Sequence, residues 1–132
     1  MKFSRQSRLL KPAEFKLVFQ QAVRSRDDSF RVLARVNNKN HHRLGMAISK
    51  KACTQAVGRN RIKRLVRESF RLQIASISQE NALDFVVMPT NLTSDQSNAT
   101  LHQSISAHWQ RLIKKAGDRL TETQQDQIRT QI

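Results

Sequence analysis

The sequence predicts an α+β fold in which three helices pack against a small, mostly antiparallel sheet, in the order α-β-β-α-β-α. Apolar residues recur at intervals of three and four in some stretches and alternate with polar residues in others, which indicates helices and strands respectively. A chain of 132 residues is long enough for one hydrophobic core and too short for two. We therefore expect a single domain over residues 1–117, followed by a polar, disordered tail at 118–132.

Helical spacing of apolar residues predicts three helices. The first lies near 12–23 and begins with Pro12, a residue that suits the first turn of a helix. The second runs from about 54 to 74. The third lies near 97–116, and we expect Gly117 to end it. Its apolar stripe consists of Leu101, Ile105, Trp109, Leu112 and Ile113.

Period-two alternation predicts the strands. Residues 30–36 alternate in this way, and residues 44–49 do so again, so we expect a hairpin across the polar segment 37–42. The compact apolar run 85–88, which Pro89 stops, predicts a buried third strand. The second face of the first strand carries Arg31, Leu33 and Arg35.

Positive charge is concentrated in the first half of the chain. Residues 1–71 hold 19 Lys/Arg against four acids, a net +15, whereas residues 72–132 hold five against six, a net −1. Such a field attracts polyanions, because neutralising phosphates releases condensed counterions. We interpret the chain as a nucleic-acid binder rather than a membrane-surface protein, since no segment pairs a basic face with the exposed aromatic and leucine face of an interfacial helix.

Composition excludes several other classes of protein. No window approaches the roughly 18 apolar residues of a membrane span, and no apolar stretch follows the basic residues near the N-terminus, so we expect no secretory signal and a cytoplasmic location. Cys53 is the only cysteine, which excludes an internal disulfide and a thiolate zinc site. We interpret it as a small, half-buried thiol.

Enzyme signatures are missing from the sequence. The three glycines, at positions 45, 58 and 117, form no phosphate-binding loop, and no metalloprotease or hydrolase motif occurs. The histidine pairs 41/42 and 102/108 lack the spacing of metal ligands, and the acids supply no paired carboxylates of the kind a nuclease uses. Composition therefore favours a binding protein over a catalyst, with no catalytic or metal-binding residue of its own.

The helix predicted at 54–74 carries the most informative pattern. On a helical wheel, its apolar side opposes a polar row at i, i+4, i+7 and i+11, interrupted only by Glu68. Like charges at this spacing weaken an isolated helix by a few tenths of a kcal/mol per pair, and an anionic partner reverses that penalty. Arginine also binds phosphate in a bidentate manner and stacks on bases. The row consists of Asn60, Arg64, Arg67 and Arg71, flanked by Arg59, Arg61 and Lys63.

Two pairs of residues outside this helix are further candidates. Lys50 and Lys51 follow the second predicted strand and extend the positive surface towards the helix. Phe15 and Phe19 lie on one face of the first predicted helix. Single-stranded RNA commonly stacks on aromatic side chains beside basic grooves, although the same apolar stripe is also what a packed helix shows.

The stretch R-L-G-M-A-I-S-K-K-A-C-T-Q-A-V-G-R-N-R-I-K-R-L-V-R-E-S-F-R, at residues 43–71, resembles the bacterial ribonuclease P protein component. The motif L-x-x-x-x-x-F-x-x-V-F at residues 9–19 is similar to the N-terminal motif of that family, and the resemblance spans residues 5–116. It implies a left-handed βαβ crossover around the basic helix, an exception to the usual right-handed rule.

The resemblance also implies a function. The chain would be the auxiliary subunit of an RNA-based endoribonuclease that removes the 5′ leader from precursor tRNA, with one protein for each catalytic RNA. The RNA would hold the active site and its magnesium ions, while the protein, with no cofactor of its own, would aid substrate affinity and metal use. Expected contacts to the catalytic RNA are Lys50, Lys51, Arg59, Asn60, Arg61, Lys63, Arg64, Arg67 and Arg71. Expected contacts to the single-stranded leader are Phe15, Phe19, Arg31, Leu33, Arg35 and Ser49.

Two positions depart from the family pattern. Leu33 stands where some relatives place an aromatic side chain on the cleft face of the strand. Thr90 and Asn91 stand where relatives often carry basic residues.

Two other function classes stay open alongside the ribonuclease P subunit. One is a free-standing RNA-binding module, such as a ribosomal protein, and the other is a helix-turn-helix DNA-binding regulator. A recognition helix needs a preceding helix joined by a short turn, whereas a strand is predicted before residue 54, which makes the DNA-binding class the weakest.

Overall fold

The predicted α+β class and single domain are confirmed in a computed structural model of the chain. It describes Arg8 and residues 11–37, 39, 41–74 and 82–131, with the side chains of the last helix described as far as Asp118. The elements in chain order are α1 (Pro12–Gln21), β1 (Val23–Arg26), β2 (Phe30–Val36), β3 (Arg43–Met46), α2 (Ala56–Gln73), β4 (Leu83–Pro89), the 3-10 helix η2 (Thr93–Asp95) and α3 (Asn98–Gln131). Within these described residues, no helix combines the length and apolarity that a membrane crossing requires.

The four strands form one sheet in the order β1-β2-β4-β3. β2 pairs antiparallel with both β1 and β4, whereas β3 pairs parallel with β4. The predicted hairpin is therefore wrong, because β4 lies between β2 and β3, where Phe85 is opposite Ala34 on one side and beside Leu44 on the other. β4 is buried along almost its whole length, and such a strand belongs at the centre of a sheet, with hydrogen bonds on both edges.

The strand predicted at 44–49 is shorter than expected. β3 ends at Met46, and the backbone carbonyl of Ser49 then accepts the Cys53 N–H at 3.2 Å in a turn. The unit β3–α2–β4 joins two parallel neighbours through the basic helix, as the family resemblance implies. The left hand of this crossover stays a prediction.

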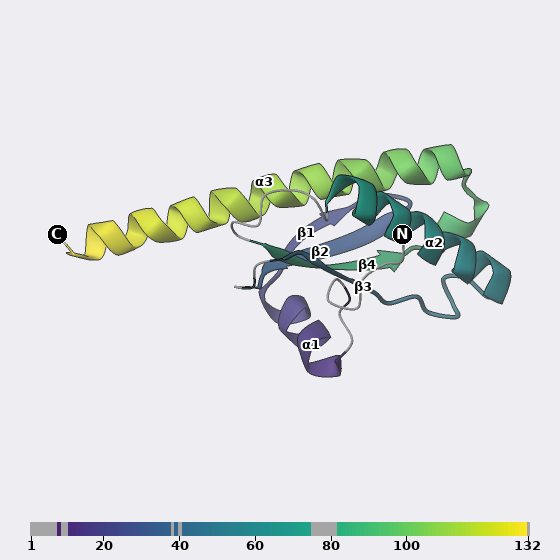
Figure 1. Cartoon of the computed structure of the whole chain (residues 1–132), viewed down its shortest axis with the longest axis horizontal. Helices are drawn as coiled ribbons and strands as arrows, with labels where there is room; N and C mark the ends of the chain where they lie inside the picture. The colour runs from purple at the N-terminus through teal and green to yellow at the C-terminus, as the bar shows by residue number, and fades with distance from the viewer. Residues whose placement is uncertain (1–7, 9–10, 38, 40, 75–81, 132) are drawn as a thin grey trace.

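The sheet separates two layers of helices (Figure 1). α2 and α3 cover one face over the main core, which contains Ile62, Phe85 and Trp109. α1 covers the other face over a smaller cluster of Val18, Leu33 and Val86. Residues 30, 32, 34 and 36 of β2 face the main core, so the predicted alternation is confirmed.

α1 begins at Pro12, as predicted, and the Glu14 side chain accepts the Lys11 backbone N–H at 3.1 Å. The helix ends at Gln21 because Ala22 is already extended and leads into β1. β1 was not predicted, since a strand of four residues is too short for period-two alternation to stand out beside a helical pattern.

α3 continues past Gly117 to Gln131, so the predicted helix end at Gly117 is wrong. A glycine inside a helix costs about 1 kcal/mol relative to alanine, and a helix anchored along its first five turns can absorb that cost. Beyond the sheet, the helix projects away from the rest of the domain (Figure 1). The disorder expected for 118–132 stays a prediction, and residue 132 lies outside the described residues.

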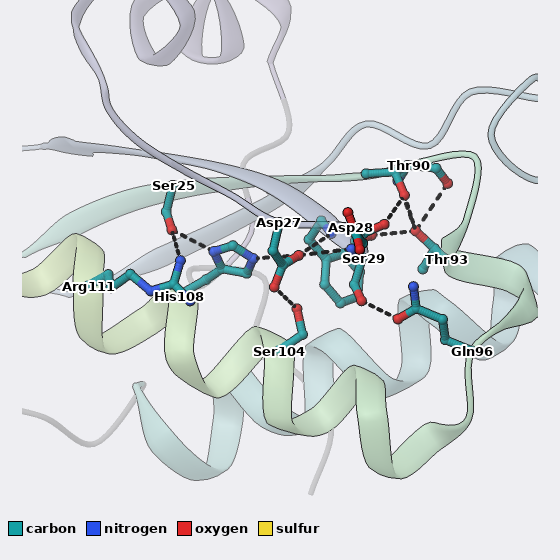
Figure 2. A network of polar contacts seen from close by, with 11 residues as sticks. Ser25, Asp27, Asp28, Ser29, Thr90, Thr93, Gln96, Ser104, His108 and Arg111 are labelled. Carbon is teal, nitrogen blue, oxygen red and sulfur yellow. Dashed lines mark hydrogen bonds and ion pairs between the residues drawn. The ribbon is translucent and has the colours of Figure 1, made fainter.

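A polar cluster fastens α3 to the turn between β1 and β2 (Figure 2). The buried His108 contacts the Ser25 hydroxyl through Nδ1 at 2.6 Å and Asp27 Oδ1 through Nε2 at 3.1 Å. Asp27 also accepts the Ser104 hydroxyl at 2.6 Å and two backbone N–H groups at 2.9 Å. Burial alone would raise the pKa of Asp27, but these hydrogen bonds outweigh it and lower the pKa to about 2.

Burial lowers the pKa of His108, although attraction to Asp27 opposes the change, so the imidazole is neutral near pH 7. Ser25, His108 and Asp27 are the residue types of a hydrolytic triad. However, Ser25 is only 5% exposed, and its hydroxyl accepts a hydrogen bond from Arg111 at 3.1 Å. We interpret the cluster as a structural clamp between the last helix and the sheet.

Candidate nucleic-acid interface

The rotation of α2 is fixed by its buried side, which lies opposite the predicted polar row. Ile62, Leu65, Val66 and Ser69 are buried, together with Phe70. Trp109 Nε1 donates to Ser69 Oγ at 2.9 Å, so the one buried hydroxyl of the helix has a partner. This rotation leaves Asn60 and Arg64 exposed. Five cations of α2 are half-buried, namely Arg59, Arg61, Lys63, Arg67 and Arg71.

Arg59 and Arg61 have structural partners within the domain. Arg59 donates to the backbone carbonyls of Cys53 and Thr54, both at 3.0 Å, and so holds the segment that enters α2. Arg61 donates to the carbonyl of Gln96 at 3.3 Å and to Oδ1 of Asn98 at 2.6 Å, and so holds the start of α3. Because a guanidinium has five N–H donors, both residues keep donors for phosphate, but in fixed positions.

The remaining cations form a surface that we call the basic ridge, defined as Lys50, Lys51, Lys63, Arg64, Arg67 and Arg71. In the part of the chain that the structure describes, none of these six side chains forms an ion pair. Lys50 and Lys51 are exposed in the turn before α2, where Ser49 Oγ accepts the Ala52 N–H at 3.1 Å. Ser49, which we expected among the leader contacts, therefore lies next to the ridge lysines.

Cys53 is buried beside the start of α2 rather than half-buried as predicted. A Cβ atom at position 58 would lie 2.8 Å from Cys53 Sγ, so only a glycine such as Gly58 allows the first turn of α2 to pack closely on the turn before it. The turn that carries the two ridge lysines is thus held against the helix that carries the other four cations.

The other face of the sheet carries Arg31, Leu33 and Arg35, as predicted, and only one of the three is fully open. Leu33 is 4% exposed and packs under α1, so its position does not support the expected leader contact. Arg35 Nε donates to Gln21 Oε1 at 2.8 Å, which ties β2 to the end of α1. Arg31 is exposed.

The two phenylalanines of α1 differ in their surroundings. Phe15 is half-buried and packs against the cluster of Val18, Leu33 and Val86. Phe19, one turn later, is 41% exposed. The sequence did not decide between core packing and base stacking for either residue. In the structure, Phe15 packs mainly in the core, whereas the ring of Phe19 is accessible.

β1 adds two arginines that were not predicted as site residues. Arg26 is directly opposite Arg31, and Arg24 is opposite Leu33, so both lie on the α1 side of the sheet. Both are exposed. In the sequence, Arg24 and Arg26 flank Ser25, but this alternation places them on one face only once β1 is recognised as a strand. We call Phe19, Arg24, Arg26 and Arg31 the α1-side surface.

One end of this face is closed by ion pairs. Arg43 donates from Nε to Asp84 Oδ1 at 2.8 Å and from Nη2 to Oδ2 at 2.6 Å, and it also pairs with Glu14. The hydrogen bond to Asp84 raises the pKa of Arg43. Because the three residues come from β3, β4 and α1, this cluster holds α1 over the sheet.

Thr90, one of the departures from the family pattern, forms hydrogen bonds that stabilise the fold. Its hydroxyl donates to the backbone carbonyl of Asp28, and its own N–H donates to Thr93 Oγ1 at 2.8 Å. Asn91 is exposed beside it. Across the described ranges, no group of three or more His, Cys, Asp or Glu side chains is placed to hold a metal ion.

Comparison with known proteins gives consistent results. The model of the Ribonuclease P family matches residues 3–113. The chain is similar to the ribonuclease P protein component of Methylococcus capsulatus, with 45% identity over 86% of each chain. It is also similar to that of Photobacterium profundum, with 46% identity over 85% of this chain and 92% of the relative. Two solved structures share the fold. The RNase P protein of Staphylococcus aureus has a TM-score of 0.68 at 28% identity, covering 83% of this chain and 94% of that one, and the Thermotoga maritima protein has a TM-score of 0.63 at 28% identity, covering 82% and 96%.

Proposed function

Because the chain belongs to the ribonuclease P protein family, we propose that it is the auxiliary subunit of the ribonucleoprotein that removes the 5′ leader from precursor tRNA in the cytoplasm. The catalytic RNA carries the chemistry and binds the magnesium ions. The protein binds that RNA, one copy for each, and the single-stranded leader of the substrate. It contributes affinity and positioning rather than a reacting group.

The observation that carries the proposal is the pair of cationic surfaces on opposite faces of one sheet. The basic ridge lies on the side of α2, and the α1-side surface lies across the sheet from it (Figure 1). A protein that touches two RNAs at once needs two such surfaces, and each has the charge to displace counterions from phosphates. A rigid sheet between them fixes the distance from the catalytic RNA to the leader.

The two surfaces suit different RNA conformations. The ridge cations lie on a helix and in a turn held against it, so they meet phosphates whose positions are also fixed, as in a folded RNA. The α1-side surface combines three arginines with the open ring of Phe19. That combination of backbone charge and a stacking platform is typical of single-strand binding.

Reconstitution tests the proposal directly. Precursor tRNA with an end-labelled leader is incubated with the protein alone, with a bacterial ribonuclease P RNA alone at low magnesium, or with both. We expect no cleavage by the protein alone, slow cleavage by the RNA alone and fast cleavage at the same bond by the mixture. Cleavage by the protein alone, or a mixture no faster than the RNA, would overturn the proposed function.

A further inference from the structure

A groove of about 430 Å³ lies between α2 and α3, next to the basic ridge and on the far side of the sheet from α1. Its volume is within the range of sites that hold a small organic group. Its lining side chains come from both helices and include Val57, Arg64, Leu65 and Glu68 of α2 and His102 of α3.

The chemistry of the groove is mixed in a way that fits a nucleobase. Leu65, only 5% exposed, supplies an apolar lining, and Val57 adds an apolar side chain. His102 of α3 contributes an aromatic ring, and such rings stack on bases. Arg64 belongs both to the groove and to the basic ridge, so a phosphate next to a base in the groove would meet a cation.

The start of α3 is held in place beside the groove. Arg61 donates to Asn98 Oδ1 at 2.6 Å and to backbone carbonyls of residues 94 and 96. These hydrogen bonds fix α3 relative to α2, so the groove is formed before any ligand binds. A preformed site avoids the cost of ordering its walls on binding.

Glu68 is an acidic residue in a groove that otherwise has only neutral and basic side chains, and its presence there needs an explanation. It lies four residues after Arg64 and three before Arg71, yet it forms no ion pair among the described residues. It is exposed, and it is the one acid on α2. An acid on a surface that docks RNA weakens binding by repelling phosphates, unless it makes a specific contact of its own.

We propose that this groove binds an unpaired guanine base of the catalytic RNA and that the Glu68 carboxylate accepts hydrogen bonds from its Watson–Crick edge. This inference rests on the proposed function. Guanine presents two adjacent donors on that edge, N1–H and the exocyclic amine, which match the two oxygens of a carboxylate. Adenine and cytosine each present a ring acceptor beside their donor, and uracil has a carbonyl on each side of its donor. With any of these bases, a lone pair of the base would face a carboxylate oxygen of Glu68 and repel it.

The proposal is tested by whether removal of the Glu68 carboxylate weakens or strengthens binding to the catalytic RNA. We measure binding of the full-length protein to a bacterial ribonuclease P RNA for Glu68→Ala and for Asp118→Ala. Both changes remove one negative charge from an exposed position, but Asp118 lies on α3 outside the groove. We expect Glu68→Ala to weaken binding about 5- to 100-fold, the range for loss of a bidentate base contact, and Asp118→Ala to leave it unchanged or slightly tighter.

Chemical probing of the same complexes identifies the base. Kethoxal modifies N1 and N2 of unpaired guanines, so we expect wild-type protein to protect one guanine of the catalytic RNA that becomes reactive again at saturating Glu68→Ala. Thermal unfolding of both variants checks that the fold is intact. Tighter or unchanged binding by Glu68→Ala, or no guanine whose protection depends on Glu68, would overturn the guanine site. Failure of the wild-type protein to bind the RNA would instead overturn the proposed function itself.

Discussion

The basic ridge and the α1-side surface are both cationic, but they are built differently. The ridge takes its cations from one helix and the turn before it, with no aromatic side chain among them. The α1-side surface takes its arginines from two strands and adds Phe19 from a helix. Under the proposed function, the difference matters because cations on a helix and the adjoining turn suit the phosphates of a folded RNA, whereas a stacking ring beside arginines suits a single strand.

The largest expected effect comes from the ridge. We predict that Arg64→Ala/Arg67→Ala weakens binding to the catalytic RNA roughly 10- to 100-fold, because two charge-assisted phosphate contacts are lost. The magnitude of the log K versus log salt slope should fall by about 1.4–1.8. Binding measured by filter retention over a salt series checks both values.

The matched control for this prediction is Arg24→Ala/Arg26→Ala, which removes the same charge from the opposite face of the sheet. It should change affinity for the catalytic RNA far less than the ridge variant. Equal losses would mean that net charge, rather than the position of the ridge, determines binding.

On the α1-side surface, we predict that Phe19→Ala weakens binding of leader-bearing tRNA by the assembled complex about 10-fold, because one base loses its stacking partner. Binding of mature tRNA should not change. Leu17→Ala is the control, since Leu17 is also 41% exposed on α1. If mature and leader-bearing tRNA lose the same affinity, Phe19 is a packing residue and not a leader contact.

Sequence patterns predicted the parts of both surfaces that depend on local periodicity. The buried side of α2 followed from its 3.6-residue repeat, and the two faces of β2 followed from alternation. The position of β4 between β2 and β3 did not, because strand pairing is decided by contacts between residues distant in the sequence. The α1-side surface was incomplete for the same reason, since Arg24 and Arg26 become neighbours of Arg31 only through the pairing of β1.

The second roles of two arginines on α2 could not be predicted, and their contact with the catalytic RNA stays a prediction. Helical spacing cannot distinguish a free arginine from one that caps the backbone of another segment, and Arg59 and Arg61 do the latter. Leu33 was placed on the correct face but is covered by α1, which alternation along one strand cannot reveal. Long-range packing, rather than local pattern, decided each of these differences.

A third prediction compares an arginine of α2 that is tied by hydrogen bonds to another segment, Arg61, with one that is free of such bonds, Arg64. We predict that Arg61→Ala lowers the free energy of unfolding by about 1–2 kcal/mol, because it loses hydrogen bonds to two backbone carbonyls and to Asn98. Arg64→Ala should change it by less than about 0.5 kcal/mol, as expected for an exposed site. Urea unfolding of both variants measures the difference. A larger loss for Arg64→Ala would contradict the division of α2 arginines into tied and free.

The smallest expected effect is a dependence of stability on pH, which arises from His108 in the structural clamp and not from either RNA surface. The pKa of His108 is lowered in the folded state, so the unfolded chain binds a proton that the folded chain does not as pH falls below about 6.5. We therefore expect the free energy of unfolding to decrease as pH falls through this range. His108→Gln should remove that part of the slope, as measured by urea unfolding from pH 7.5 to 5. An unchanged slope would mean that folding does not lower the pKa of His108.

The claim that the two surfaces bind two different RNAs is tested most directly by one ratio. We measure the affinity of the assembled complex for leader-bearing tRNA relative to mature tRNA, using Arg64→Ala/Arg67→Ala at a concentration that saturates the catalytic RNA. We predict the wild-type ratio, because a ridge variant that is forced onto the RNA still has an intact α1-side surface. A fall to the ratio of Phe19→Ala would show that the ridge also binds the leader and would contradict the assignment of one RNA to each surface.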